Sequence, residues 1–197
     1  MICENRPNVT SNRIIDAATR VFAREGITGA TTREIARLAK VNEVTLFRHF
    51  KSKQELLQQV VLKSTKDYES VFENAPIETI DDVRRTIEAH VAVHLRKLRA
   101  CEEFVRTFYG EWKRHPDLCR RILVESAKPV RRKFIDYLKA AQKKGLILED
   151  LDVTTAADAL TGMLVAGILR RPFTDREYTN SRFSKTCQKL FFRGIAP

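Results

Sequence analysis

Three helix-start signals lie close together near the beginning of this 197-residue chain and restrict the folds that it can adopt. Thr31 is followed three residues later by Glu34, which is the spacing of a capping box at a helix N-terminus. Ser52 and Glu55 repeat that spacing, and Asn42 between the two pairs is a strong N-cap. The pattern predicts a short helix over TTREIARLAK, a second over EVTLFRHF, a turn of three or four residues between them, and a longer helix, KQELLQQVVLKSTKDYESVFE, after Ser52.

An amphipathic helix precedes these signals. It is expected from about Ser11 to Arg24, with Gly26 ending it. Its apolar stripe consists of Ile14, Ala17, Ala18, Val21 and Phe22. Two short helices at a tight turn, set on a first helix, predict a helix-turn-helix, whose second short helix lies in the DNA major groove. An ordinary helical hairpin with a solvated face is the alternative that spacing alone leaves open.

The remainder of the chain also has the helical pattern. Glycine and proline are scarce, and apolar residues recur at intervals of three and four. The sequence therefore predicts an all-α protein with a helix-turn-helix DNA-binding domain over residues 1–55 and a larger helical effector-binding and dimerisation domain over residues 56–197. The helices expected in the second domain cover residues 79–98, 101–114, 116–144 (which Pro129 interrupts or restarts), 153–170 and 179–193.

The net charge favours a polyanionic partner. It is +11 at neutral pH, and residues 1–53 contain ten Lys and Arg against five Asp and Glu. A membrane surface is the other usual partner, but the apolar run at residues 160–169 is shorter than the roughly 20 residues that span a bilayer. We therefore expect a soluble, cytoplasmic protein. The four cysteines are far apart and form no C-x-x-C pair, so neither a zinc site nor a disulfide framework is indicated.

The second short helix divides into an inward and an outward face. Leu46 and Phe50 lie four residues apart and should turn inward with Val41. Phosphates are bound by cations, hydroxyls and helix N-termini, whereas base edges are read by side chains near the helix start, here Asn42 to Thr45. The predicted DNA-binding residues are Thr31, Thr32, Arg33, Asn42, Glu43, Val44, Thr45, Phe47, Arg48, His49 and Lys53.

A family resemblance supports the DNA-binding interpretation. The run TTREIARLAKVNEVTLFRHFKSKQEL, preceded by IIDAATRVFAREGITGATT, resembles the N-terminal domain of the tetracycline-repressor (TetR) family of bacterial transcription regulators. The similarity covers about residues 11–60 and includes G-x-x-x-x-T-T-x-x-I-A, V-x-x-x-T-L-[YF]-x-[HY]-F and K-S-K-x-x-L. It implies that this domain binds operator DNA and that the helical remainder forms a dimer and a small-molecule pocket.

Three residues depart from the family pattern. Lys40 stands where glycine is usual, which adds a cation and strains the turn if that position needs a positive φ. Phe47 stands where tyrosine is common, so a phenol-to-phosphate hydrogen bond is missing. Glu43 places an acid at the DNA surface, where it either supports the helix dipole, the interpretation that we favour, or accepts a hydrogen bond from cytosine N4.

A looser similarity to the same family continues in EWKRHPDL and AADALTGMLVAGIL. Small residues at helical spacing allow two helices to approach closely, which predicts a twofold interface or, alternatively, packing within one chain. The predicted dimer residues are Ala159, Gly162, Met163, Ala166, Gly167, Leu190 and Phe191. An apolar or aromatic effector would contact His90, His94, Phe104, Phe108 and Trp112, although such an aromatic stripe is more often core.

Other function classes have little support. The chain contains no G-x-S-x-G, Walker, H-E-x-x-H or glycine-rich dinucleotide motif, so no enzyme and no cofactor is predicted. His90 and His94 have the spacing of metal ligands, but no acid or cysteine stands in an obvious partnering motif, so no metal is predicted. We expect a homodimeric repressor that a small molecule releases from a palindromic operator. The alternative is a DNA-binding regulator without an effector.

Overall fold

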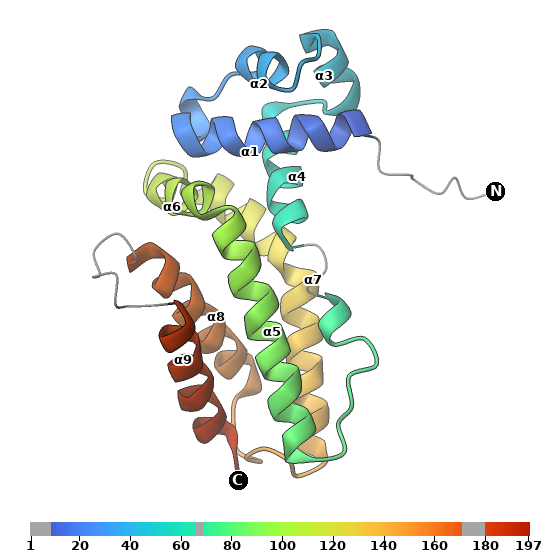
Figure 1. The fold of residues 1–197 in the computed structure, drawn as a ribbon, viewed down its shortest axis with the longest axis vertical. Helices are drawn as coiled ribbons and strands as arrows, with labels where there is room; N and C mark the ends of the chain where they lie inside the picture. Colours follow the sequence, from blue (N-terminus) through green and yellow to red (C-terminus); the bar gives the residue numbers. More distant parts are fainter. Residues whose placement is uncertain (1–8, 66–68, 171–179) are drawn as a thin grey trace, which may run out of the picture. The chain divides into compact units, whose positions relative to one another are not determined.

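The computed structural model describes residues 9–65, 69–170 and 180–197, and throughout these ranges the regular structure is helical (Figure 1). The predicted all-α class is confirmed. The elements are α1 (Val9–Gly29), α2 (Thr32–Leu38), α3 (Glu43–His49), α4 (Lys53–Thr65), the 3₁₀ turn η1 (Glu69–Val71), α5 (Ile80–Ala100), α6 (Glu102–Glu111), α7 (Pro116–Lys143), α8 (Val153–Arg170) and α9 (Asn180–Ile195).

The chain forms two compact units that differ from the expected division at residue 55. Unit 1 contains Met1–Ser64 and Cys101–Ser126, and unit 2 contains Thr65–Ala100 and Ala127–Pro197. The expected boundary falls inside α4, and α6 with the first part of α7 belongs to unit 1. The helix after Ser52 is also shorter than predicted, because α4 ends at Thr65 and η1 follows.

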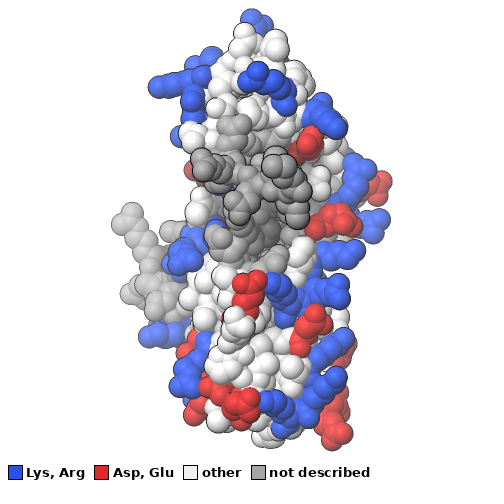
Figure 2. Space-filling view, turned by 90° about the vertical axis from the view of Figure 1, so that its right-hand side faces the viewer, with Lys and Arg blue, Asp and Glu red and all other residues white. Residues whose placement is uncertain are grey.

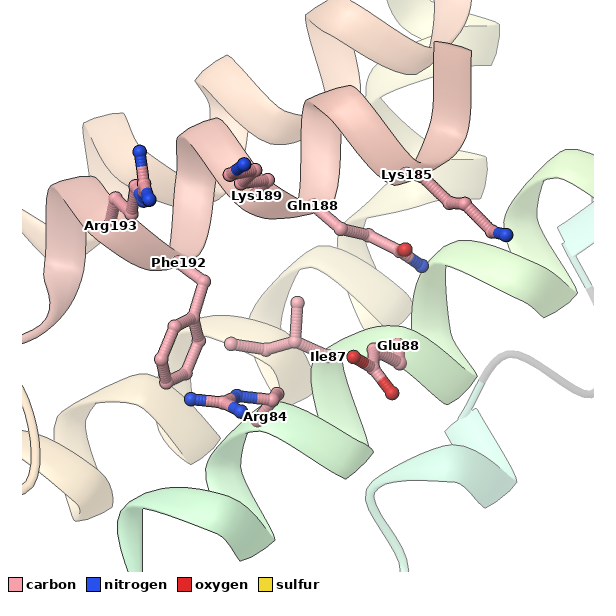
Figure 3. A pocket seen from close by; sticks show the side chains of 8 residues that line it. All are labelled: Arg84, Ile87, Glu88, Lys185, Gln188, Lys189, Phe192 and Arg193. Atoms are coloured by element: carbon pink, nitrogen blue, oxygen red, sulfur yellow. The ribbon is translucent and has the colours of Figure 1, made fainter. Parts of the chain in front are cut away.

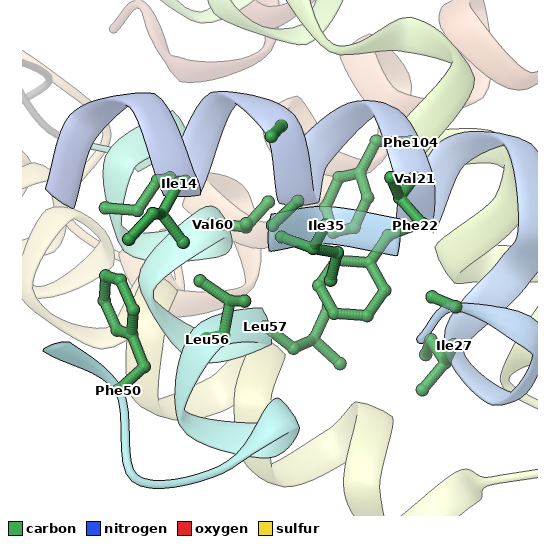
Figure 4. Close-up of a cluster of buried hydrophobic side chains, with 14 of the residues drawn as sticks. Ile14, Val21, Phe22, Ile27, Ile35, Phe50, Leu56, Leu57, Val60 and Phe104 are labelled. Carbon is green, nitrogen blue, oxygen red and sulfur yellow. The ribbon is translucent and has the colours of Figure 1, made fainter. Parts of the chain in front are cut away.

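The core of unit 1 confirms the stripe predicted on the first helix. All five of its apolar residues are buried, and Phe22 is completely inaccessible to solvent. Leu46 and Phe50 are buried as predicted, and Leu56 joins them from α4 (Figure 4). Phe104 reaches the same cluster from α6. Because one apolar cluster unites all these helices, the position of α3 depends on packing that extends well beyond the two short helices.

Side-chain caps hold the helix starts of unit 1. Thr31 Oγ1 accepts a hydrogen bond from Glu34 N at 3.2 Å, and Asn42 Oδ1 accepts one from Val44 N at 2.9 Å. Ser52 Oγ does the same for Glu55 N at 3.1 Å. All three predicted helix starts are confirmed. Gly26 also breaks the first helix as expected, since its φ of 76° is in the left-handed region that glycine adopts without a steric penalty.

In unit 2, α5 packs against α8 and α9, and these two pack against each other. The core includes Leu138, Leu160 and Leu164, together with a ring cluster in which Phe134 lies 4.5 Å from His90 between ring centroids. The 28-residue helix α7 continues through Pro129. Helix α8 is long and apolar enough to cross a membrane by length and composition, but four of its five buried residues belong to this core, so it is weak evidence for a span.

Candidate nucleic-acid interface

The turn between α2 and α3 is closed by backbone hydrogen bonds and by an arginine from α1. Val41 N donates to Ala36 O at 3.0 Å, and Lys40 has a φ of 53°. Arg13 Nη2 donates to Ala39 O at 2.6 Å and to Lys40 O at 3.2 Å. The turn therefore does need a left-handed residue where this chain has lysine. Arg13, which sequence reasoning missed, satisfies the carbonyls that the tight turn exposes.

The outward face of α3 combines apolar, polar and cationic groups. Val44 is 76% exposed and Phe47 is 46% exposed, an unusual pair for a surface helix. Asn42 and Arg48 are exposed beside them, while Thr45 is half-buried. His49 is half-buried as well. Because the inward residues are buried in the core of unit 1, this face is presented as a fixed surface of a size that fits the major groove.

Glu43 joins the starts of the two short helices. Its Oε1 accepts a hydrogen bond from Thr32 Oγ1 at 2.5 Å. Both residues are half-buried, and Glu43 lies in the first turn of α3, where a carboxylate complements the helix dipole. The Thr32 hydroxyl, which the sequence assigned to phosphate binding, thus donates its proton within unit 1. This arrangement sets α2 against α3 before any DNA is bound.

Lys53 also has an internal role. Its Nζ donates to Thr28 O at 3.2 Å and to Ala30 O at 3.0 Å, which ties the start of α4 to the end of α1 and the residue after it. An ammonium group has three N–H donors, so these two bonds leave one for a phosphate. The same cation can therefore position α4 and contact DNA.

Glu34 holds two arginines at the side of the helix-turn-helix. Arg37 Nε donates to Glu34 Oε2 at 2.7 Å, and Arg24 Nη2 donates to Glu34 Oε1 at 3.0 Å. The bonds from Arg37, followed by the bond from Arg24, lower the pKa of Glu34 to about 2. Arg33 is exposed and can contact a phosphate. The Thr31 hydroxyl, by contrast, already accepts the N-cap hydrogen bond from Glu34 N.

The visible charge supports a cationic unit 1. On the face drawn in Figure 2, the part of unit 1 in view carries mainly Lys and Arg side chains. Over the part of unit 2 in view, acidic and basic side chains alternate. A cationic surface around a helix-turn-helix suits the DNA backbone, which carries one negative charge per phosphate.

The residues predicted to contact an effector are divided between the units. Phe104 and Phe108 are buried in the core of unit 1, and Trp112 packs against that core. This agrees with the alternative interpretation, in which the aromatic stripe is core. His90 is 2% exposed and His94 is half-buried in unit 2. Burial lowers the pKa of His90 to about 3, with repulsion from His94 as the smaller cause, and burial lowers the pKa of His94 to about 4. Both imidazoles are neutral at physiological pH.

The predicted dimer residues are only partly accessible. Ala159, Gly162 and Ala166 are exposed on α8, and Met163 is half-buried. Leu190 is 60% exposed on α9. Two members of the predicted set pack within the chain, as the alternative interpretation has it. Phe191 is 6% exposed in the core of unit 2, and Gly167 lies under the Phe183 ring, where an added Cβ would clash with the ring.

Metal ligands and reactive thiols receive no support from the described part of the chain. Across those residues, no three His, Cys, Asp or Glu side chains gather as a metal site. Burial raises the pKa of the Cys119 and Cys187 thiols, which disfavours the reactive thiolate. Cys3 lies outside the described residues.

Comparisons with known proteins agree on one family. Residues 14–60 match the model of the bacterial regulatory proteins of the tetR family, and residues 98–184 match the C-terminal domain of AefR-like transcriptional repressors. The chain is 28% identical over 138 residues to the HTH-type transcriptional regulator YvkB of Bacillus subtilis, covering 70% of each chain. It is 26% identical to the HTH-type transcriptional repressor KstR2 of Mycolicibacterium smegmatis, covering 76% of this chain and 73% of that one.

Solved structures show the same fold. The fatty acid degradation regulator FadR from Bacillus halodurans matches with a TM-score of 0.80 at 22% identity, over 96% of this chain and 97% of that one. FadR from Bacillus subtilis in complex with stearoyl-CoA matches with a TM-score of 0.78, also at 22% identity, over 93% and 98% of the two chains. With a helix-turn-helix in unit 1 and matches to both domains of one family, this chain is a TetR-family transcriptional regulator, a member of a non-enzymatic DNA-binding family.

Proposed function

We propose that the protein is a dimeric repressor that binds a palindromic operator through α3 and leaves it when a small molecule binds. The observation that carries the proposal is the outward face of α3, on which Val44 and Phe47 are exposed at the surface of a well-packed unit. Exposing large apolar side chains costs solubility, and contact with DNA would give them a use: Val44 would meet thymine methyl groups in the major groove, and Phe47 would meet the DNA backbone. The cytoplasm, where bacterial operator DNA is accessible, is the expected compartment.

The contacts divide into base readout and backbone positioning. Asn42, Val44 and Thr45, near the start of α3, would read base edges, since they lie at the helix end that enters the groove. Arg48, Lys53 and Arg33 would contact phosphates, which position the protein without reading sequence. Phe47 and His49 would pack against the sugar and phosphate backbone. Thr31, Thr32 and Glu43 would act mainly by setting the geometry of α2 and α3.

A twofold dimer is supported by the exposed small residues of α8 and by Leu190. Ala159, Gly162 and Ala166 would allow the α8 helices of two copies to approach closely, with Met163 and Leu190 at the edge of the contact. A twofold dimer would place two α3 helices about 34 to 36 Å apart, or a small multiple of one DNA turn, on a near-palindrome.

Release by an effector rests on two supports. The structure of FadR in complex with stearoyl-CoA is of a protein with this fold holding a ligand. In this chain, His90 and His94 lie among rings in unit 2, and neutral imidazoles beside Phe134 suit an apolar or aromatic molecule. A regulator that binds DNA without an effector is the second candidate.

Footprinting on the DNA that flanks the protein's own gene tests the proposal. We expect a protected near-palindrome whose half-sites are separated by whole helical turns, together with a dimer at micromolar concentration by sedimentation. A screen of small molecules by thermal shift, followed by footprinting with each binder, tests release. A monomer with undiminished operator affinity contradicts the dimer. Binders that all leave the footprint unchanged favour the regulator without an effector.

A further inference from the structure

A groove lined by cations lies between α5 and α9 in unit 2. Its volume is about 360 Å³, within the range of small-molecule sites. The lining residues are Arg84, Ile87 and Glu88 from α5 and Lys185, Gln188, Lys189, Phe192 and Arg193 from α9 (Figure 3). Four cations and one carboxylate leave the groove with a net positive charge.

The floor of the groove is apolar and partly aromatic. Ile87 is 1% exposed, and Phe192 is half-buried against the core of unit 2. The Arg84 guanidinium carbon lies 4.5 Å from the centroid of the Phe192 ring, a cation–π contact that holds both side chains at one end of the groove (Figure 3). A flat or linear apolar group could therefore lie against the ring and Ile87 side by side.

The cations of α9 are available to a ligand. Over the parts of the chain that the structure describes, no ion pair joins Lys185, Lys189 or Arg193 to a carboxylate. Arg84 is shared with Asp81, whose Oδ1 lies 3.6 Å from Nη1. Each helical turn of α9 thus places at the groove a cation that has no ion-pair partner among the described residues. Successive cations follow one another along the helix at about 6 Å, with Lys185 and Arg193 at opposite ends (Figure 3).

We propose that this groove binds an amphipathic organic anion, with its apolar arm against Phe192 and Ile87 and its oxyanion head between Lys185 and Lys189 (Figure 3). Glu88 argues against an extended polyanion, because its carboxylate would lie beside the backbone of any acidic polymer in the groove. The apolar floor argues against inorganic anions, which could not use it. This site goes beyond the proposed function, since its occupancy requires neither DNA nor an effector at His90 and His94.

Calorimetry on the full chain at low salt, with 1-naphthyl phosphate as the probe, tests the proposal. Uncharged 1-naphthol tests the contribution of the head, and inorganic phosphate tests that of the arm. We expect 1-naphthyl phosphate to bind roughly tenfold more tightly than either, since several charge-assisted contacts and an apolar contact act together. Equal binding of 1-naphthol or of inorganic phosphate would overturn the amphipathic assignment.

Matched variants locate the site. Replacing both Lys185 and Lys189 with glutamine should weaken 1-naphthyl phosphate binding by roughly five- to tenfold, given what exposed charges contribute. Lys139→Gln, an exposed lysine of unit 2 that does not line the groove, is the control and should change nothing. If the control weakens binding as much as the double variant, the probe responds to net charge and the groove is not its site.

A gain of affinity provides the independent check. Glu88→Gln removes the one carboxylate of the groove and should strengthen 1-naphthyl phosphate binding two- to fivefold, an effect that partial unfolding cannot produce. Unchanged or weaker binding by this variant overturns the proposal. So does displacement of the probe by an arbitrary DNA duplex, because the groove would then be part of a polyanion-binding surface. Operator footprinting of the same variants keeps a failure here separate from a failure of the DNA-binding proposal.

Discussion

Among the described residues, each unit places one glycine and one other residue in the left-handed region: Gly26 and Lys40 in unit 1, Gly145 and Asn74 in unit 2. In unit 1, Lys40 has a φ of 53° in the turn before α3, with Arg13 bonded to its carbonyl. In unit 2, Gly145 has a φ of 68° after α7, and a Cβ there would meet nothing within 4 Å. The glycines adopt this conformation without a steric penalty, and asparagine adopts it more readily than lysine does. Unit 1 accepts strain where a cation faces the DNA side, as expected of a functional surface.

The largest effects should come from substitutions in the cores of the two units. Phe22→Ala in unit 1 and Phe134→Ala in unit 2 each remove a side chain that is at most 2% exposed, so each should cost about 3 to 5 kcal/mol in the free energy of unfolding. Urea titration measures this loss. At temperatures where both variants remain folded, Phe22→Ala should lose more DNA affinity, because Phe22 and Leu46 share one core. Equal losses of DNA affinity in the two variants would contradict the assignment of DNA binding to unit 1.

Replacing Lys40 with glycine and Gly145 with alanine should change the free energy of unfolding in opposite directions. Lys40→Gly should stabilise the protein by about 0.5 to 1 kcal/mol, because glycine avoids the steric penalty of positive φ at some cost in chain entropy. Gly145→Ala should destabilise it by about 1 kcal/mol for the converse reason. Lys40→Gly should also reduce the salt dependence of DNA binding if the ammonium group contacts a phosphate. Urea midpoints of the two variants that move in the same direction would contradict the comparison.

Phe47→Tyr tests whether the exposed ring on α3 of unit 1 lies near a phosphate of bound DNA. The ring is 46% exposed, so a hydroxyl at its edge can reach solvent or a phosphate. One added hydrogen bond to a charged group, weakened by solvent, should raise affinity by about 1 kcal/mol per subunit on operator and on random duplex alike. Fluorescence anisotropy measures both affinities, and melting temperature is the control. Lower stability without tighter binding would mean that the phenol lacks a partner.

The smallest effects should come from one ion-paired carboxylate in each unit, Glu34 in unit 1 and Asp82 in unit 2. The pKa of Glu34 is lowered from 4.5 to about 2, chiefly by Arg37, and that of Asp82 from 3.8 to about 2, chiefly by Arg85. A lowered folded-state pKa gives stability that is present above the ordinary value and is lost as pH falls toward 2. Between about pH 5 and pH 3, Glu34→Gln and Asp82→Asn should each lose less stability in urea titrations than the unmodified chain. An identical pH dependence in all three proteins would show that neither carboxylate contributes to acid sensitivity.

The sequence predicted features that depend on near neighbours in the chain better than features that depend on the tertiary fold. Thr31, Asn42 and Ser52 start helices where predicted, because capping depends on neighbours two or three residues away. Phe104 and Phe191 were assigned to a pocket and to a dimer interface, but both lie in cores. Periodicity identifies an apolar face without naming the helix that covers it. The carbonyl partners of Lys53, 23 and 25 residues away, are equally a product of the tertiary fold.

The central claim is that the outward face of α3 binds the DNA backbone and bases. The most direct measurement compares the salt dependence of duplex binding for Arg48→Ala and Arg120→Ala, since both arginines are exposed in unit 1 and only Arg48 lies on α3. We predict that Arg48→Ala lowers the slope of log affinity against log salt by about 0.9 for each phosphate that the arginine neutralises, while Arg120→Ala leaves it unchanged. Equal slopes for Arg48→Ala and the unmodified chain, or the same reduction of the slope in both variants, would contradict the claim.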